Sequence, residues 1–309
     1  MPDQQREALI ADKQTEGQID TVTIGRFGKR QLPRGSKNSV YVIKGPEGNQ
    51  LVAKIPRLSA MSGLRDELDI LNKLHSTDSP GEDNIQHVGF IANLCVSFCC
   101  CSTTYEDVYF TQFYPGGSLT SRGFSDITPA HFLQLVDALN FLRAQNVVHG
   151  DVNPDKVLFD QQGKAGRVKL CNFSSAMADT AKKGQLSKTG TAFLAPELLE
   201  RVSGQNGFTI NNDINFSTDM YALALTLVYM LTQWRFGDAD VKKAKPSDTT
   251  ARLEAIANGL RPDIDEVKRK TLKARGEPDP ETAEFHEKLY NILPAMWSRK
   301  HEERMHISD

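Results

Sequence analysis

A polar loop enclosed by apolar segments constrains this chain more than any other stretch. An apolar pair, Val147-Val148, leads into His149, and Asp151 follows two residues later. The chain then returns to an apolar segment at Val157-Leu158-Phe159. The sequence thus places an acid, close to a histidine, on a loop between two apolar segments. What such a loop can do depends on the residues that the rest of the chain brings to it.

The composition is that of a soluble globular protein. The chain has 309 residues, enough for one or two domains, with 25% charged residues and a formal net charge of -2. This balance gives no overall attraction to nucleic acid or to membranes. No apolar run approaches the roughly 20 residues of a membrane span, and residues 1–15 contain no apolar signal-peptide core. We therefore expect a cytoplasmic protein with no nucleic-acid partner and no membrane span.

The cysteines favour a reducing compartment. Three of the five are consecutive, at Cys99–Cys101, which suits neither a disulfide framework nor the spacing of zinc ligands. We interpret these residues as buried thiols on a β-strand. Redox sensing by the same three residues is the alternative.

The loop resembles the catalytic loop of eukaryotic-type protein kinases, whose pattern is H-R-D-x-x-x-x-N. In that resemblance Asp151 is the catalytic acid, which accepts or orients the substrate hydroxyl. Two positions differ from the pattern. Gly150 replaces the arginine that receives a phosphate from the activation segment, and Lys156 replaces the metal-binding asparagine. The resemblance therefore locates a site whose chemistry has changed.

Motifs before the loop resemble the nucleotide-binding parts of the same family. Lys54 follows a predicted hairpin and resembles the strand lysine that contacts ATP phosphates. Glu67 lies on a predicted helix with a leucine stripe and resembles the glutamate that pairs with that lysine. Val40 takes the valine position of the glycine-rich loop, where only Gly35 of three glycine positions is a glycine. Such a loop is stiffer and more crowded, which opposes phosphate binding by its backbone.

The segment Thr111–Leu119 resembles the kinase hinge pattern T-E-Y-x-P-G-G-x-L. Thr111 takes the gatekeeper position in this resemblance. The backbone groups of Gln112, Phe113 and Tyr114 would then face an adenine. A strand followed by a Pro-Gly-Gly turn would give the same local pattern, but the register with Lys54 and Asp151 favours the hinge.

Motifs after the loop continue the resemblance in the family order. Asn172-Phe173-Ser174 stands where the family has D-F-G, and Gly190–Glu197 closely matches the end of the activation segment. Asp219–Leu225 resembles the start of the central helix of the large lobe. Arg304 resembles the arginine that pairs with Glu197, a structural pair in which one buried charge needs the other. The resemblance covers roughly residues 21–307.

This resemblance implies an α+β fold, the bilobal protein-kinase-like fold. We expect a flexible leader over residues 1–20 and a protein-kinase-like domain over residues 21–309. Within that domain, a small β-rich N-lobe would span residues 21–114. A larger, mainly α-helical C-lobe would span residues 115–309.

Both positions that bind Mg²⁺ in the family are altered. Mg²⁺ needs hard oxygen ligands, mostly carboxylates. Asn172 is the one metal candidate and offers a neutral oxygen, whereas Lys156 places a cation where a cation would bind. Two alternatives stay open for neutralising the phosphate charge. Lys156 could contact a γ-phosphate directly, or Asp155 could act as a substitute metal ligand. The sequence thus allows ATP and argues against Mg²⁺.

Three functions follow from these residues. The first is a pseudokinase, a nucleotide-binding scaffold or allosteric regulator with little or no phosphotransfer, motivated by the altered metal positions. The second is an active atypical Ser/Thr protein kinase with altered metal use, motivated by Lys54, Glu67 and Asp151. The third is an interaction module without nucleotide, motivated by the missing loop glycines. We rank them in this order.

Overall fold

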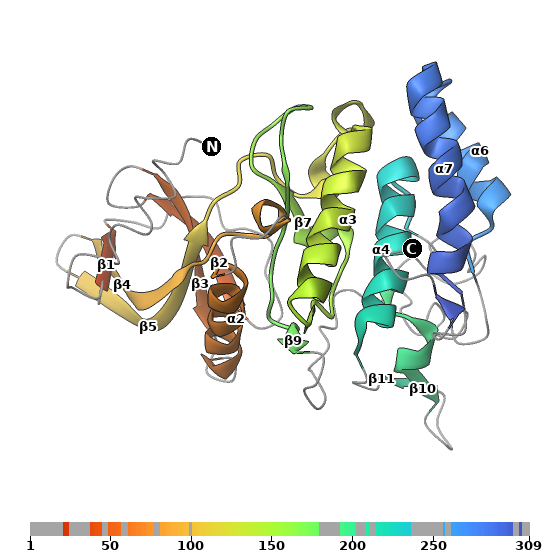
Figure 1. The fold of residues 1–309 in the computed structure, drawn as a ribbon. Helices are drawn as coiled ribbons and strands as arrows, with labels where there is room; N and C mark the ends of the chain where they lie inside the picture. Colours follow the sequence, from red (N-terminus) through yellow and green to blue (C-terminus); the bar gives the residue numbers. More distant parts are fainter. Residues whose placement is uncertain are drawn as a thin grey trace. The chain divides into compact units, whose positions relative to one another are not determined.

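The computed structural model describes about two thirds of the chain. The described residues are 21–24, 38–44, 49–56, 61–76, 81–98, 101–178, 192–201, 208–210, 214–235, 256, 261–298 and 303–304. The predicted leader, Gly35, Cys99 and Cys100 lie outside these residues. The described chain forms two compact units (Figure 1). The first runs to Leu68 and resumes over Val88–Phe113, and the second contains Asp69–His87 and the chain from Tyr114 onward.

The first unit is a five-stranded sheet with a helix. Its strands are β1 (Thr21–Ile24), β2 (Asn38–Lys44), β3 (Gln50–Pro56), β4 (Phe90–Phe98) and β5 (Cys101–Gln112), in the order β1-β4-β5-β3-β2. Strands β2 to β5 pair antiparallel, and β1 pairs parallel with β4. The predicted hairpin is confirmed, because β2 and β3 pair from Asn38↔Pro56 to Lys44↔Gln50.

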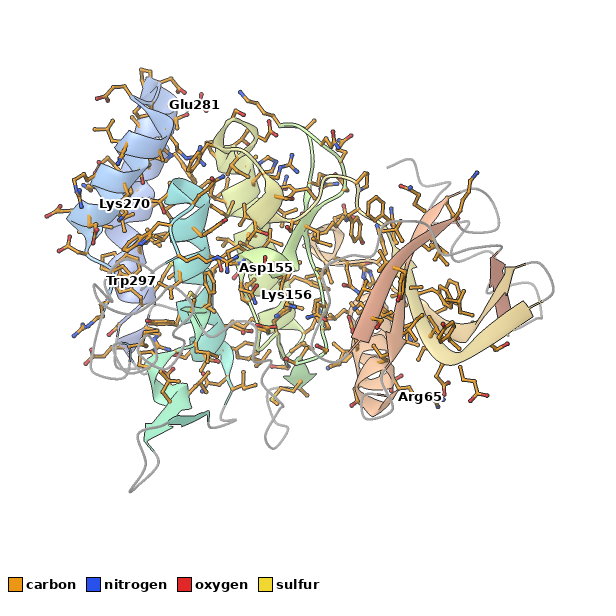
Figure 2. All side chains as sticks on the ribbon, turned by 180° about the vertical axis from the view of Figure 1, so that it is seen from behind. Arg65, Asp155, Lys156, Lys270, Glu281 and Trp297 are labelled. Carbon is orange, nitrogen blue, oxygen red and sulfur yellow. The ribbon has the colours of Figure 1, made fainter. Side chains whose placement is uncertain are left out.

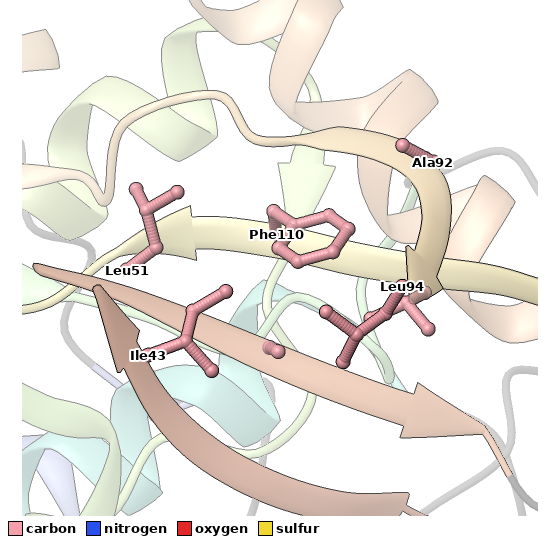
Figure 3. Close-up of a cluster of buried hydrophobic side chains, with 7 residues drawn as sticks. Ile43, Leu51, Ala92, Leu94 and Phe110 are labelled. Atoms are coloured by element: carbon pink, nitrogen blue, oxygen red, sulfur yellow. The ribbon is translucent and has the colours of Figure 1, made fainter. Parts of the chain in front are cut away.

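One face of this sheet carries the core of the first unit (Figure 3). Alternating positions on neighbouring strands bring apolar side chains to the same face. Phe110 is fully buried and stacks on Phe90 with ring centroids 5.0 Å apart. The cluster consists of Ile43, Leu51, Ala53, Ala92, Leu94, Val108 and Phe110. Helix α2 (Met61–Leu74) starts in this unit and ends in the second.

The second unit is mainly helical. Its helices are α3 (Pro129–Ala144), α4 (Phe216–Thr232), α6 (Ile264–Arg275) and α7 (Pro280–Met296). Short antiparallel pairs join β6 (Val147–Val148) to β9 (Met177–Ala178), β7 (Val157–Phe159) to β8 (Val168–Leu170), and β10 (Leu199–Arg201) to β11 (Phe208–Ile210). The expected α+β class is confirmed, with a β-rich first unit and a mainly helical second unit. The predicted limits of the lobes stay predictions.

Helix α4 is buried along most of its length. All residues from Thr218 to Thr232 are buried. Asn215 begins the helix with a reciprocal cap, in which its side chain accepts the Thr218 N–H and the Thr218 hydroxyl accepts the Asn215 N–H. No helix among the described residues is long and apolar enough to cross a bilayer. A buried central helix gives the second unit a rigid element on which a loop can be fixed.

The predicted ion pair between Arg304 and Glu197 is present. The two guanidinium nitrogens lie 2.5 Å and 2.7 Å from the two carboxylate oxygens. The Arg304 side chain is 1% exposed, and it also donates to the Ser217 carbonyl at 2.9 Å. The pair therefore ties the end of the chain to the segment before β10 and to the start of α4.

We expect Arg304→Ala to lower the free energy of unfolding by about 3 kcal/mol, because it removes the buried guanidinium group that pairs with the Glu197 carboxylate. Urea denaturation of the purified chain measures this change. Arg269→Ala is the matched control, since that arginine is largely exposed and pairs with Glu266 within α6; it should cost less than about 1 kcal/mol. Equal effects of the two substitutions would contradict the structural role.

Candidate functional site

Lys54 and Glu67 form an ion pair in the first unit. Nζ of Lys54 lies 2.7 Å from Oε1 of Glu67. The Glu67 side chain is fully buried and that of Lys54 is 12% exposed. A carboxylate buried this deeply needs a compensating cation, which Lys54 supplies. The structure thus brings these two predicted site residues together, while their role in catalysis stays a prediction.

Neighbouring strands surround Lys54. Val40 on β2 lies directly opposite Lys54 in the register of β2 and β3. Directly opposite residues of an antiparallel pair share one face of the sheet. The ring of Tyr109 on β5 lies 5.1 Å from Nζ of Lys54, a cation–π contact. Val40 and Tyr109 therefore confine the lysine next to the Glu67 carboxylate.

The predicted hinge begins at the end of β5. Thr111 is buried, and Gln112 is the last residue of that strand. The N–H of Phe113 donates to the Gln50 carbonyl at 3.2 Å. This N–H is therefore engaged within the first unit. The hinge roles of Thr111, Gln112, Phe113 and Tyr114 stay predictions.

The predicted catalytic loop is held by one buried carboxylate on α4. Oδ2 of Asp219 accepts the N–H of His149 at 2.6 Å, and Oδ1 accepts the N–H of Gly150 at 2.9 Å. Burial raises the pKa of Asp219 to about 7, although both backbone N–H groups oppose that shift. Gly150 has a φ of +74°, and a Cβ there would lie 2.8 Å from the Ser175 carbonyl oxygen. The glycine thus suits a tight left-handed position.

His149 is buried in its neutral form. Burial lowers the pKa of its imidazole to about 4. Its Nδ1 accepts the N–H of Asp151 at 3.2 Å, so Nε2 carries the proton and donates to the Cys171 carbonyl at 3.2 Å. The ring packs edge-on against Phe173, with centroids 4.9 Å apart. His149 therefore links the loop to the segment that contains Asn172.

Asp151 lies just beneath the surface at the centre of the loop. Asp151 is 8% exposed, and its Oδ1 accepts a hydrogen bond from the Asn153 side chain at 2.7 Å. Burial raises the pKa of Asp151 to about 6, while Lys156 and Asn153 act in the opposite direction. The group is thus an ionised carboxylate at neutral pH with a pKa suited to proton transfer.

Lys156 faces the Asp151 carboxylate directly. Its Nζ lies 3.7 Å from Oδ2 of Asp151, and its side chain is 17% exposed. Lys156 and Asp155 both belong to a single 3₁₀ turn, Pro154–Lys156, which directly precedes β7 in the sequence. Figure 2 labels both residues. The lysine that replaces the family asparagine therefore forms an ion pair with the predicted catalytic acid.

Asp155 is engaged by its own chain. Oδ1 accepts the Thr120 hydroxyl at 2.9 Å, and Oδ2 lies 3.6 Å from the Arg235 guanidinium. A carboxylate with partners on both oxygens is less available as a metal ligand. Among the described residues, no three His, Cys, Asp or Glu side chains are grouped so as to hold a metal ion.

Asn172 adopts a left-handed conformation, with φ +67°. Asparagine tolerates this region better than most residues. Its N–H donates to Oε1 of Gln86 at 2.8 Å. Gln86 could not be identified as a site residue from the sequence, because nothing in the local pattern around it indicates a contact with a residue 86 positions away.

Comparison with known families decides the assignment. Residues 29–309 match the protein kinase domain family. The chain belongs to this family. The match includes Lys54, Glu67, Asp151, Lys156 and Asn172, so both retained and altered positions lie within the kinase domain.

Relatives of this kinase domain include named Ser/Thr kinases. It is 28% identical to CBL-interacting serine/threonine-protein kinase 15 of Arabidopsis thaliana over 208 residues, which are 64% of this chain and 45% of that protein. It is 28% identical to Serine/threonine-protein kinase PKH3 of Eremothecium gossypii over 225 residues, 66% of this chain and 27% of that protein. The match to mouse Serine/threonine-protein kinase 32C is 29% identical over 159 residues, 49% of this chain and 30% of that protein. The kinase domain therefore spans less than half the length of these relatives.

We expect Asp151→Asn to stabilise the kinase domain at pH 7 by about 1–3 kcal/mol. The folded pKa of Asp151 is about 6 against an ordinary 3.8, so the folded wild type binds a proton more tightly than the unfolded chain. Wild-type stability therefore falls, relative to the variant, as the pH rises from about 4 to about 6. Thermal melting of both proteins across this range measures the difference.

The matched control for this experiment is Asp155→Asn, which alters the exposed neighbouring carboxylate. Its effect on melting should be small and should not follow the pH profile of Asp151→Asn. A lower melting temperature for Asp151→Asn at pH 7 than for the wild type would contradict the account of a carboxylate destabilised by burial.

Proposed function

We propose that this kinase domain is a pseudokinase that binds ATP without a divalent cation and acts as a signalling scaffold or allosteric regulator. The ion pair between Lys156 and Asp151, at 3.7 Å, carries this proposal. A permanent cation takes the position where the family has a metal ligand, so a metal ion there would be repelled at short range. We place its role in the cytoplasm, with a protein partner.

The remaining donor set does not fit Mg²⁺. Asn172 supplies at most one neutral oxygen, and its backbone N–H is already bonded to Gln86. The Asp155 carboxylate is engaged by Thr120 and Arg235. Because Mg²⁺ requires several hard oxygen ligands in near-octahedral geometry, these residues support nucleotide binding in which Lys156 supplies the positive charge.

The first unit supports retention of a nucleotide. Lys54 is held by Glu67 at 2.7 Å and is still 12% exposed, so its ammonium group can contact a phosphate. Following the kinase resemblance, we propose Val40, Thr111, Gln112 and Phe113 of this unit, together with Tyr114, as further contacts of ATP. We propose the same role for Gly35, which lies outside the described residues.

The second candidate is an active atypical Ser/Thr protein kinase with altered metal use. Asp151 favours it, because a carboxylate with a pKa of about 6 can accept a proton from a substrate hydroxyl. The names of the relatives also favour it. In this case Lys156 would contact the γ-phosphate. An interaction module without nucleotide is the third candidate and rests on the altered glycine-rich loop alone.

We expect ATP to raise the melting temperature of the wild-type chain equally with EDTA and with Mg²⁺ or Mn²⁺. The physical reason is that Lys156 takes the place of the metal charge. A thermal-shift titration with ATP measures the effect. Stabilisation that requires the metal would contradict the proposal, and no stabilisation under any condition would favour the interaction module.

The matched variant combines Lys156→Asn with Asn172→Asp, which places the two family ligands in this chain. It should lose stabilisation by ATP in EDTA and be stabilised by ATP only when Mg²⁺ is present. Lys270→Asn changes a lysine on α6 (Figure 2), and it should leave both responses unchanged. A double variant that behaves like the wild type would show that Lys156 does not replace the metal.

A further inference from the structure

Strand β1 covers part of one edge of the sheet in the first unit. Its four residues, Thr21–Ile24, pair parallel with Asn93–Val96 of β4. On its other side β4 pairs antiparallel with β5. Among the described strands, β1 alone lies on the outer side of β4 (Figure 1). The backbone groups along this edge of β4 are therefore paired with a separate, four-residue segment.

Strand β4 lacks the residues that usually protect a sheet edge. Its nine residues, Phe90–Phe98, read FIANLCVSF and include no charged residue, proline or glycine. Strand β2, at the opposite edge, ends at the exposed Lys44. Charged residues and prolines keep edge strands from pairing with other chains, whereas uncharged segments of high β-propensity pair readily. An uncovered β4 would therefore be a ready template for another strand.

The cover is short compared with the strand beneath it. Strand β1 pairs with four of the nine residues of β4, and parallel pairing is slightly less stable per residue than antiparallel pairing. A second β4 strand would pair antiparallel over a longer stretch. A two-fold axis at Leu94 places Phe90 opposite Phe98 of the second copy, so the strand matches itself in length and composition. Such a partner offers β4 more backbone hydrogen bonds than β1 does.

The core of the first unit holds β4 in place while its edge changes partner. Ala92 and Leu94 belong to the buried cluster on one face of the sheet (Figure 3). Strand β5, on the inner side, pairs with β4 from Phe90 to Phe98. Exchange at the outer edge therefore leaves the core and the pairing with β5 intact.

We propose that the outer edge of β4 is an interaction surface for the β4 strand of a second copy of this chain, and that β1 is its removable cover. While β1 is paired, the edge is closed and the chain is a monomer. When β1 leaves, two β4 strands pair antiparallel and join the two sheets in a closed, two-fold dimer. This inference concerns association and does not depend on whether nucleotide binds.

Sedimentation velocity of the full chain tests the proposal. Val22→Pro combined with Thr23→Pro removes two adjacent backbone N–H groups, so β1 cannot pair whichever of the two faces β4. The association constant should rise about tenfold or more, because the dimer no longer has to displace the hydrogen bonds of β1. The matched control, Val22→Thr with Thr23→Val, exchanges the two side chains and keeps the β-propensity of the strand. It should sediment as the wild type does, as a monomer.

A further substitution locates the interface. Asn93→Lys added to the proline variant places a charge on the edge of each β4, and it should restore the monomer. Thermal melting identifies a proline variant that fails to fold. In that case Val22→Gly with Thr23→Gly, which weakens a strand but keeps its N–H groups, decides in its place.

Three outcomes would overturn the proposal. The first is a monomer in the folded proline or glycine variant at concentrations where the proposal requires a dimer, or a wild type that dimerises equally well. The second is a dimer that persists with Asn93→Lys. The third is a series of higher oligomers, which would show that β4 pairs with another edge, such as that of β2, instead of with itself.

Discussion

The position of the predicted catalytic loop in the second unit depends on one buried carboxylate. Asp219, on the fully buried part of α4, accepts the N–H groups of His149 and Gly150 and so fixes the loop that carries Asp151. Its raised pKa shows that the carboxylate is costly to bury, which only well-aligned donors offset. Because α4 is buried from Thr218 to Thr232, the loop is held by a deeply packed helix. The geometry of the site follows from this attachment.

The hydrogen bonds from the loop to Asp219 belong to the fold, whereas the residues beside Asp151 decide the chemistry. The loop, the Lys54–Glu67 pair and the Arg304–Glu197 pair keep the architecture of a protein kinase domain. The charge beside Asp151 is different, because Lys156 brings a fixed cation to within 3.7 Å. A fixed ammonium group cannot bridge phosphate oxygens as a dication does. The residues that hold the kinase fold and the residues at the family's metal-binding positions are thus different sets in this chain.

The sequence predicted the parts of the site that follow from motif order. Lys54 and Glu67 are in contact, and so are Arg304 and Glu197, because each pair belongs to segments whose register the motifs define. Contacts between positions without a motif could not be predicted. The parallel pairing of β1 with β4 depends on which sheet edge is open, and alternation along β1 does not encode it.

Polar contacts between residues far apart in the sequence could not be predicted from it either. Gln86 holds Asn172, and Thr120 with Arg235 engages Asp155, although none of these residues stands out by type or spacing. The hydrogen bond from the Phe113 N–H to the Gln50 carbonyl likewise arises where the pairing of β3 with β5 ends. Such contacts depend on tertiary placement of ordinary polar side chains.

The measurement that tests the central claim most directly is transfer of radiolabelled γ-phosphate from ATP to the chain itself and to a generic protein substrate. It compares the wild type with Asp151→Ala, in Mg²⁺, in Mn²⁺ and in EDTA. The account predicts no incorporation above that of Asp151→Ala under any of these conditions. Incorporation that depends on Asp151 would contradict it and would establish an active kinase with altered metal use.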